Sequence, residues 1–280
     1  MRAAPLLAGL LLSLSVPTFG QNGVSLRLDI PYCSPDGEDL LLDAYLPKGE
    51  GPFPAVVVIH GGSWRSGTRR QLALHAWWFA REGLAAFAID YRLAPRHVWP
   101  AQIHDCKAAV RWIRAHAAEY RVDPERIGAH GYSAGGHLAA LLGAAGPGDG
   151  LEGVQEGEES DTRIQAVSVG AAPLDLRGSA TFQEFLGGPP GAIPDVYRAA
   201  SPVVHVSGDE PPFFFFNGSR DRVVRSNSLR AMIDPLRAAG IRAEFYEVEG
   251  TGHIATVLHP GAIERAATFL RENLATGSGR

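Results

Sequence analysis

Short runs of consecutive apolar residues alternate with helix-like stretches from residue 24 to the end of the chain, and this alternation constrains the fold most. The apolar runs include AVVVIH (55–60), LAAFAIDY (84–91) and IQAVSVGA (164–171). Such runs are typical of strands that are buried on both faces, as in a parallel sheet covered by helices. The pattern therefore predicts an α/β fold.

Eight strands and five main helical stretches are expected. The first two strands form an opening hairpin, and the strand segments are 24–30, 39–47, 55–60, 84–91, 126–132, 164–171, 212–219 and 243–250. The helical stretches are 69–82, 101–120, 134–145, 225–239 and 261–274. A chain of 280 residues with 45% hydrophobic residues can bury one sizeable core. We therefore predict one catalytic domain over 21–280, built on a mostly parallel eight-stranded sheet flanked by helices.

The N-terminus has the pattern of an export signal. The segment MRAAPLLAGLLLSLSVPTFGQ has a cation at Arg2, an apolar stretch over 6–16 and a small residue at Gly20. The apolar stretch is too short to span a bilayer. The sequence therefore predicts a signal peptide over 1–20, a secreted or periplasmic product, and no membrane span.

Charge and cysteine content limit the classes of partner. The formal net charge is −4 and there is no long basic run, which argues against a nucleic-acid or polybasic membrane surface. We therefore expect a small-molecule partner. The two cysteines, Cys33 and Cys106, are too few for a disulfide framework. No catalytic thiol is implied, and the sequence leaves open both whether these cysteines pair and the oligomeric state.

Two segments interrupt the alternation of strands and helices. Residues 146–163 are rich in Gly and Glu and nearly lack large apolar side chains, so we expect a mobile surface loop. A lid is the alternative for this loop. Residues 172–203 are too long for a tight connection and carry Phe182, Phe185 and Tyr197. This second segment is expected to form a small cap of short helices over the strand ends.

A serine is surrounded by glycines in GYSAGG, residues 131–136. The segment fits the G-x-S-x-G elbow, in which Ser133 stands on a strained turn between a strand and a helix with its Oγ exposed. Alone the pattern is only moderately specific, because an ordinary Gly-rich turn has the same composition. Ser133 is a candidate nucleophile if the chain also supplies a base, an acid and an anion hole.

Position in the predicted sheet selects the base and the acid. Functional groups in such sheets gather where strands end at their carboxyl side, and among ten histidines this favours His60 and His253. His253 follows a strand and a Gly-containing loop, so it is the better base. Asp221 follows the strand 212–219, whereas Asp209 precedes it and belongs at the opposite edge. The order Ser133, Asp221, His253 is the one expected with this elbow.

An anion hole is predicted where strand 55–60 runs into HGGSW. Backbone N–H groups of Gly62 and Ser63, with Gly61 as a further candidate, would face the elbow, and Ala134 would supply the N–H after the nucleophile. His60 is then a loop-shaping residue. Trp64 is expected either to line the substrate pocket or to pack beneath this loop, and Tyr132 is a second candidate pocket residue.

The motifs together resemble a known family. They are H-G-G-S-W (60–64), D-Y-R-L-A-P (90–95), G-Y-S-A-G-G-H (131–137), the Asp in GSRDRVV and the His in GTGH. In this order they resemble α/β-hydrolase esterases related to hormone-sensitive lipase. Within that group the chain looks more like secreted bacterial carboxylesterases and feruloyl or acetyl-xylan esterase-like enzymes. The resemblance implies an α/β-hydrolase fold, with Ser133, His253 and Asp221 as nucleophile, base and acid.

The leading functional hypothesis is a secreted serine carboxylesterase that works through an acyl-enzyme without cofactor or metal. Its substrate would be a small-molecule or polysaccharide-linked ester. A preference for short acyl chains is expected because no extended apolar lid is visible in the sequence. An amidase or exopeptidase on the same fold is the alternative enzyme. A non-catalytic binding protein of the same fold is the alternative from another class.

Overall fold

The structure is a computed structural model that describes residues 23–154 and 161–275. The predicted signal peptide, residues 1–20, lies outside the described residues. Across the two described ranges, no helix has both the length and the apolar character needed to cross a membrane.

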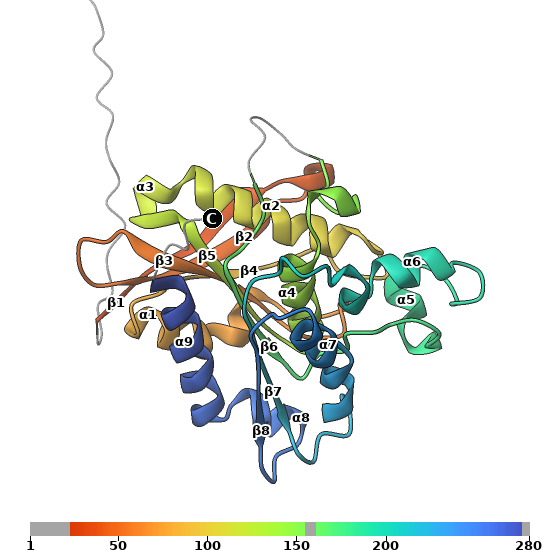
Figure 1. Cartoon of the computed structure of the whole chain (residues 1–280). Helices are drawn as coiled ribbons and strands as arrows, with labels where there is room; N and C mark the ends of the chain where they lie inside the picture. Colours follow the sequence, from red (N-terminus) through yellow and green to blue (C-terminus); the bar gives the residue numbers. More distant parts are fainter. Residues whose placement is uncertain (1–22, 155–160, 276–280) are drawn as a thin grey trace, which may run out of the picture.

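The described strands form one twisted sheet, shown edge-on in part in Figure 1, with the order β1-β2-β4-β3-β5-β6-β7-β8. β1 pairs antiparallel with β2, and β2 pairs antiparallel with β4, while the pairs from β4 onward are parallel. The strands are β1 Val24–Cys33, β2 Leu40–Pro47, β3 Phe53–Ile59, β4 Ala85–Ile89, β5 Val122–Tyr132, β6 Ala166–Gly170, β7 Phe213–Gly218 and β8 Ala243–Val248. The predicted hairpin and the mostly parallel eight-stranded sheet are confirmed.

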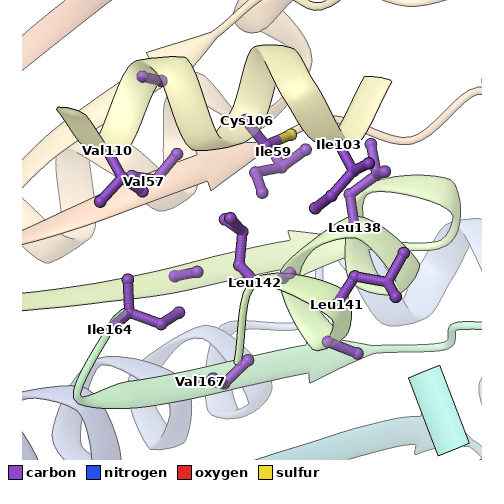
Figure 2. Close-up of a cluster of buried hydrophobic side chains, with 14 of the residues drawn as sticks. Val57, Ile59, Ile103, Cys106, Val110, Leu138, Leu141, Leu142, Ile164 and Val167 are labelled. Carbon is purple, nitrogen blue, oxygen red and sulfur yellow. The ribbon is translucent and has the colours of Figure 1, made fainter. Parts of the chain in front are cut away.

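Helices cover both faces of the sheet. In Figure 1, α1 and α9 lie on one face and α2, α4 and α7 on the other. Figure 2 shows the second layer, where Val57 and Ile59 of β3 pack against α2 and α4. The longer helices are α1 Ala73–Arg81, α2 Ala101–Ala115, α4 Ala134–Ala144, α7 Ser226–Ala238 and α9 Pro260–Ala275. Because both faces are buried there, the inner strands β3, β4, β6 and β7 consist mainly of apolar residues.

The structure differs from the predicted elements at a few boundaries. The stretch expected as one helix over 101–120 is divided at His116 into α2 and the short α3, Ala117–Tyr120. The His116 ring turns back onto α2, with its Nδ1 2.8 Å from the carbonyl oxygen of Trp112. Cys33 and Cys106 are both free thiols. The cysteine on α2 is a buried core residue beside Ile59 (Figure 2).

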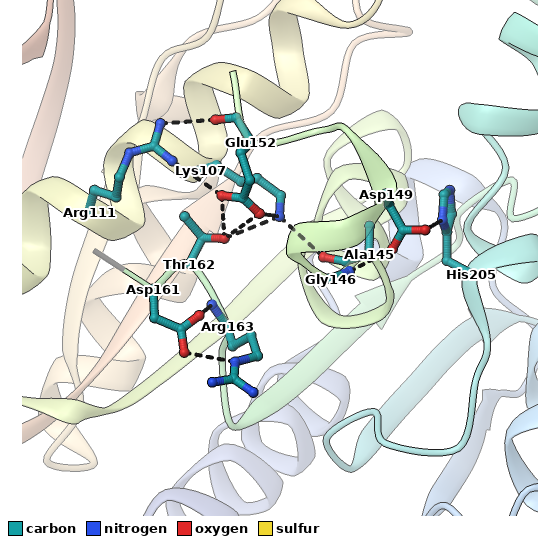
Figure 3. A network of polar contacts seen from close by, with 10 residues as sticks. All are labelled: Lys107, Arg111, Ala145, Gly146, Asp149, Glu152, Asp161, Thr162, Arg163 and His205. Carbon is teal, nitrogen blue, oxygen red and sulfur yellow. Dashed lines mark hydrogen bonds and ion pairs between the residues drawn. The ribbon is translucent and has the colours of Figure 1, made fainter. Parts of the chain in front are cut away.

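The sequence predicts a mobile surface loop over residues 146–163, whereas the structure holds the ends of this segment in place. Lys107 of α2 is buried, and its Nζ donates to the carbonyl oxygen of Ala145, to Glu152 and to the hydroxyl of Thr162. Figure 3 shows this cluster, in which Arg111 also contacts Glu152. A buried ammonium group requires such partners. The described ends of the segment are therefore pinned to α2, and residues 155–160 lie outside the described residues.

Short helices form the segment 172–203, as predicted. They are η4 Ala180–Phe182, α5 Gln183–Leu186, α6 Pro194–Ala199 and η5 Pro202–His205. Phe185 and Tyr197 are buried, and the Tyr197 hydroxyl donates to the carbonyl oxygen of Gly188. The remaining short elements are η1 Pro35–Gly37, η2 Arg69–Leu72, η3 Pro147–Asp149 and α8 His253–Val257.

Candidate active site

Ser133 stands on a sharp turn between β5 and α4. Its backbone has φ 57° and ψ −122°, a conformation that non-glycine residues adopt only under constraint. The neighbouring glycines make the turn sterically feasible. A Cβ on Gly131 would lie 2.1 Å from the carbonyl oxygen of Gly135, and a Cβ on Gly135 would lie 2.0 Å from that of Ile59. The glycines around the serine are therefore required by close backbone approach.

His253 and Asp221 are brought together although 32 residues separate them. The Asp221 side chain is fully buried, and its Oδ2 lies 2.7 Å from Nδ1 of His253. Its Oδ1 accepts the backbone N–H groups of Val223 and Val224 at 2.8 and 2.9 Å. Because a carboxylate only accepts, Nδ1 of His253 carries the hydrogen and Nε2 is left as an acceptor.

The loops that carry this pair are joined to each other. A Cβ on Gly218, at the end of β7, would lie 2.3 Å from the carbonyl oxygen of Thr251. The same carbonyl accepts the N–H of Arg220 at 2.9 Å. His253 begins the short helix α8, directly after Gly252. The loops after β7 and β8 therefore hold the Asp221 carboxylate and the His253 imidazole in fixed positions relative to each other.

Tyr132 contacts His253 and is not among the residues that line the cavity next to Ser133, and its role as a pocket residue stays a prediction. Its hydroxyl donates to the backbone carbonyl of His253 at 2.6 Å, and the two rings are 5.2 Å apart. Burial, together with the negative charge of Asp221, raises the pKa of Tyr132. The hydroxyl therefore stays protonated and remains a donor.

The loop after β3 lies against the elbow and is strained. Gly62, Ser63 and Trp64 have φ values of 110°, 55° and 58°, and a Cβ on Gly61 would lie 3.2 Å from Cβ of Ser133. Among the hydrogen bonds found within 23–154 and 161–275, none uses the backbone N–H of Gly62, Ser63 or Ala134. These three N–H groups therefore have no hydrogen-bond partner among the described residues.

Trp64 both packs beneath this loop and lines the cavity. Only 4% of its surface is exposed, and its ring stacks on Phe185 of the cap with centroids 4.2 Å apart. Its Nε1 donates to Nδ1 of His137 at 3.3 Å, and Nε2 of His137 lies 2.7 Å from the carbonyl oxygen of Ala200. His137 therefore connects the loop to the cap, and burial lowers its pKa to about 4.

A cavity of about 490 Å³ opens beside Ser133. Its apolar part is formed by Trp64, Phe182 and Phe185, and a polar part by Ser179, Thr181, Asn227 and Ser228. Ser63 and Ala134 also line it. The sequence had not indicated Asn227 and Ser228. The available signal was their place at the start of α7, just after the segment that carries Asp221.

The competing candidates are placed elsewhere. Buried His60 has Nδ1 2.7 Å from the carbonyl oxygen of Gly61 and stacks on Tyr91, which fits a loop-shaping role. Asp209 is exposed at the other end of β7 and accepts the hydroxyl of Ser207. In the described part of the chain, no group of three or more His, Cys, Asp or Glu side chains could hold a metal ion.

Comparison with known proteins finds one matching family and several similar esterases. A family model described as BD-FAE matches residues 42–235. The probable carboxylic ester hydrolase LipM of Mycobacterium tuberculosis is 35% identical over 92% of this chain, and the chain spans 60% of the length of LipM. The chain similarly spans 56% and 61% of the curated M. tuberculosis esterases LipC and LipQ.

Two solved structures share the fold over most of the chain. A truncated carbohydrate esterase from gut microbiota has a TM-score of 0.80 and 25% identity, and covers 93% of this chain and all of its own. Esterase 2 of Thermogutta terrifontis, phosphoramylated by tabun, has a TM-score of 0.76 and 32% identity. That alignment covers 89% of this chain and 94% of the Thermogutta chain. The α/β-hydrolase fold is therefore confirmed.

Proposed function

Because the chain belongs to the BD-FAE family, we propose that it is a carboxylic ester hydrolase that uses Ser133 as nucleophile, His253 as base and Asp221 as acid. The observation that carries the proposal is the 2.7 Å contact between Asp221 and the Nδ1 of His253, a residue that also contacts Tyr132, the neighbour of Ser133 in the chain. The esterase names of similar proteins and structures support the same activity.

The geometry suggests how each group acts. With Nδ1–H held by Asp221, Nε2 of His253 accepts the proton of Ser133 as Oγ bonds to the ester carbonyl carbon. The carbonyl oxygen becomes an oxyanion that faces the free N–H groups of the anion-hole residues. Nε2 then returns the proton to the leaving alcohol, and an acyl-enzyme remains. Water then attacks the acyl carbon, with His253 again taking and returning the proton, which releases the carboxylic acid and frees Ser133. No cofactor takes part in these steps.

The anion hole would consist of the N–H groups of Gly62, Ser63 and Ala134. Their donors are unpaired within the described chain, and they lie in segments that contact the turn of Ser133. Gly61 remains a further candidate donor, and its small size is also required, since a Cβ there would lie 2.9 Å from the carbonyl oxygen of Tyr132. Fixed backbone donors of this kind stabilise the developing charge without reorganising during the reaction.

Short acyl chains fit the cavity best. Its volume of about 490 Å³ must hold groups on both sides of the ester, and this is in the lower half of the range of small-molecule sites, about 300–1,000 Å³. The stacked pair of Trp64 and Phe185 closes one wall. The proposed substrate is therefore a short-chain ester of a small molecule or a polysaccharide.

Two alternatives remain distinguishable by experiment. An amidase or exopeptidase would cleave an anilide at a rate similar to that of the matched ester. A non-catalytic binding protein would hydrolyse neither. The complete arrangement of an imidazole, a carboxylate and a strained serine favours hydrolysis over binding alone.

Labelling with a phosphonate ester probe tests the proposed nucleophile. We expect one adduct, on Ser133, located by peptide mass spectrometry, because this serine stands on the strained turn that lines the cavity and is the proposed partner of His253. Ser133→Ala should lose both labelling and ester hydrolysis, while Ser66→Ala is the matched control on the neighbouring loop. An adduct on Ser63 or Ser66, or full activity in Ser133→Ala, would contradict the proposal.

We also propose that the chain is exported through its predicted signal peptide at 1–20, on the grounds of the sequence pattern. Fractionation of a bacterial host that expresses the full chain, followed by N-terminal sequencing, tests this. The expected result is a processed protein in the periplasm or medium. An unprocessed protein confined to the cytoplasm would overturn the assignment.

A further inference from the structure

A chain of buried hydrogen bonds runs beneath α8, the short helix that begins with His253. The hydroxyl oxygen of Ser168 in β6 lies 3.0 Å from Nδ1 of His130, and Nε2 of His130 lies 2.9 Å from Nδ1 of His75. Nε2 of His75 lies 2.7 Å from the carbonyl oxygen of Val257, the last residue of α8. Ser168 and both histidines are buried to within 1% of full burial.

The terminal carbonyl fixes every hydrogen in this chain. A carbonyl only accepts, so Nε2 of His75 carries a hydrogen and, in the neutral ring, Nδ1 accepts from Nε2–H of His130. Nδ1 of His130 then accepts from the hydroxyl of Ser168. Burial lowers the pKa of His75 to about 4 and the pKa of His130 well below its usual value. Both rings are therefore neutral at pH 7, with each ring nitrogen paired.

The helix α8 is anchored at both ends from the strand of the predicted nucleophile. Tyr132 of β5 donates to the carbonyl of His253 at 2.6 Å, and His75, held by His130 of the same strand, donates to the carbonyl of Val257. The outer side of α8 is bare, because Ile254 is 71% exposed. The hydrogen bonds to the carbonyls of His253 and Val257 thus connect α8 to β5, the strand that ends just before Ser133.

We propose that His75 and His130 are positioning residues, whose neutral hydrogen-bond chain fixes α8 and thereby holds His253 in place for proton transfer from Ser133. The inference rests on the proposed function, since it assumes that His253 is the base. Phe79 and Phe216 pack on the ring of His130, with centroids 4.9 and 6.1 Å away. These aromatic rings exclude water, which would otherwise compete for the hydrogen bonds of His130.

Substitutions at His75 separate positioning from general stability. His75→Leu removes the donor to Val257 and the acceptor for His130, whereas His75→Gln keeps one donor and one acceptor. A displacement of about 1 Å in a catalytic group can cost about a hundredfold in rate. We therefore expect His75→Leu to lower kcat about tenfold to a hundredfold with KM within about threefold, and His75→Gln to recover most of the loss.

The control is His116→Leu, which removes a histidine whose ring also lies against a backbone carbonyl but at the junction of α2 and α3. Its kcat should equal that of the wild type. All variants are assayed below their melting temperatures with a short-chain nitrophenyl ester. If His75→Leu is folded and keeps wild-type kcat, the inference fails. If it does not fold, Ser168→Ala replaces it, with a severalfold fall in kcat expected and an unchanged kcat refuting the inference.

A spectroscopic measurement does not depend on activity. Nitrogen NMR of ¹⁵N-histidine-labelled protein should show His75 and His130 as neutral rings with the hydrogen on Nε2 at pH 7. A charged ring, or a hydrogen on Nδ1, would overturn the assignment. Retained activity in Ser133→Ala would instead refute the proposed function, so the two failures are distinguishable.

Discussion

Replacing Asp221 by asparagine changes one atom and tests the central geometry. In the structure, Oδ1 of Asp221 accepts two backbone N–H groups, from Val223 and Val224, while Oδ2 faces Nδ1 of His253. The amide oxygen of an asparagine will keep the two N–H groups, so its NH₂ group must face the imidazole. Nδ1 of His253 then has to accept, and the ring hydrogen moves to Nε2. That tautomer cannot take the proton of Ser133.

The structure sets the size of the effect. The productive tautomer requires the amide to flip, which loses both backbone hydrogen bonds and leaves the part-buried N–H of Val223 and the buried N–H of Val224 unpaired. Each such group costs about 1–3 kcal/mol, so the flip costs about 2–6 kcal/mol. At about 1.4 kcal/mol per factor of ten, kcat should fall between about 30-fold and about 10⁴-fold. The corresponding change in a serine protease triad costs about 10⁴ in kcat.

The assay is steady-state hydrolysis of a nitrophenyl acetate or butyrate at pH 7.5, about a unit above the ordinary histidine pKa, with circular dichroism to confirm folding. KM should change little, because the interaction strengthens in the transition state. Asp209→Asn is the matched control: this exposed carboxylate lies at the other end of β7, about 20 Å along the strand at about 3.3 Å per residue. The kcat of Asp209→Asn should stay within about twofold of the wild-type value. A folded Asp221→Asn that keeps kcat within a few-fold of wild type, or a larger loss in Asp209→Asn, would refute the reasoning.

Three further outcomes are expected. Butyryl and acetyl esters should be hydrolysed faster than dodecanoyl esters in a chain-length series, and the opposite order would assign residues 172–203 a lipase-like role. Lys107→Met should lower the free energy of unfolding by about 3 kcal/mol in urea titrations without changing kcat, because it leaves buried acceptors around Glu152 unpaired; its control, Arg163→Met, breaks an exposed pair worth about 0–1 kcal/mol. Burial lowers the pKa of His137 to about 4, so the unfolded chain binds an extra proton as pH falls from about 6.5 to 4 and stability drops by up to about 1.4 kcal/mol per unit. His137→Gln should flatten that acid loss in denaturant titrations at pH 7 and pH 5, and an unchanged slope would contradict the assigned neutral state.

The sheet could be predicted because its signal is local. Each strand is a short apolar run bounded by turn residues, and the order of the elements restricts which edge a following residue reaches. That is why Asp221 and Asp209, twelve positions apart, were placed at opposite ends of β7. The glycines around Ser133 were equally informative, since no other residue tolerates backbone contacts as short as 2.0 Å from a Cβ.

Side-chain contacts between distant elements left no comparable signal. The sequence does not indicate that the Tyr132 hydroxyl donates to the backbone carbonyl of His253, in the loop after β8. Residues 146–163 were expected to be a mobile loop from composition. Their ends are held by Lys107, whose only local context is an amphipathic helix. In both cases the partner lies at least 38 residues away.

The histidines show most directly where such reasoning stops. Following a strand distinguishes His60 and His253 from the eight other histidines, yet it gives no reason to connect His75, in the first turn of α1, with catalysis. Its partners are 55 and 182 residues away, and an imidazole on a buried helix face has the same sequence pattern as any core residue. Each buried ring nitrogen needs a hydrogen-bond partner, and this requirement explains the contacts of His75 and His130. Once Val257 fixes the direction of the hydrogen bonds, the position of the base helix depends on side chains that never touch the substrate.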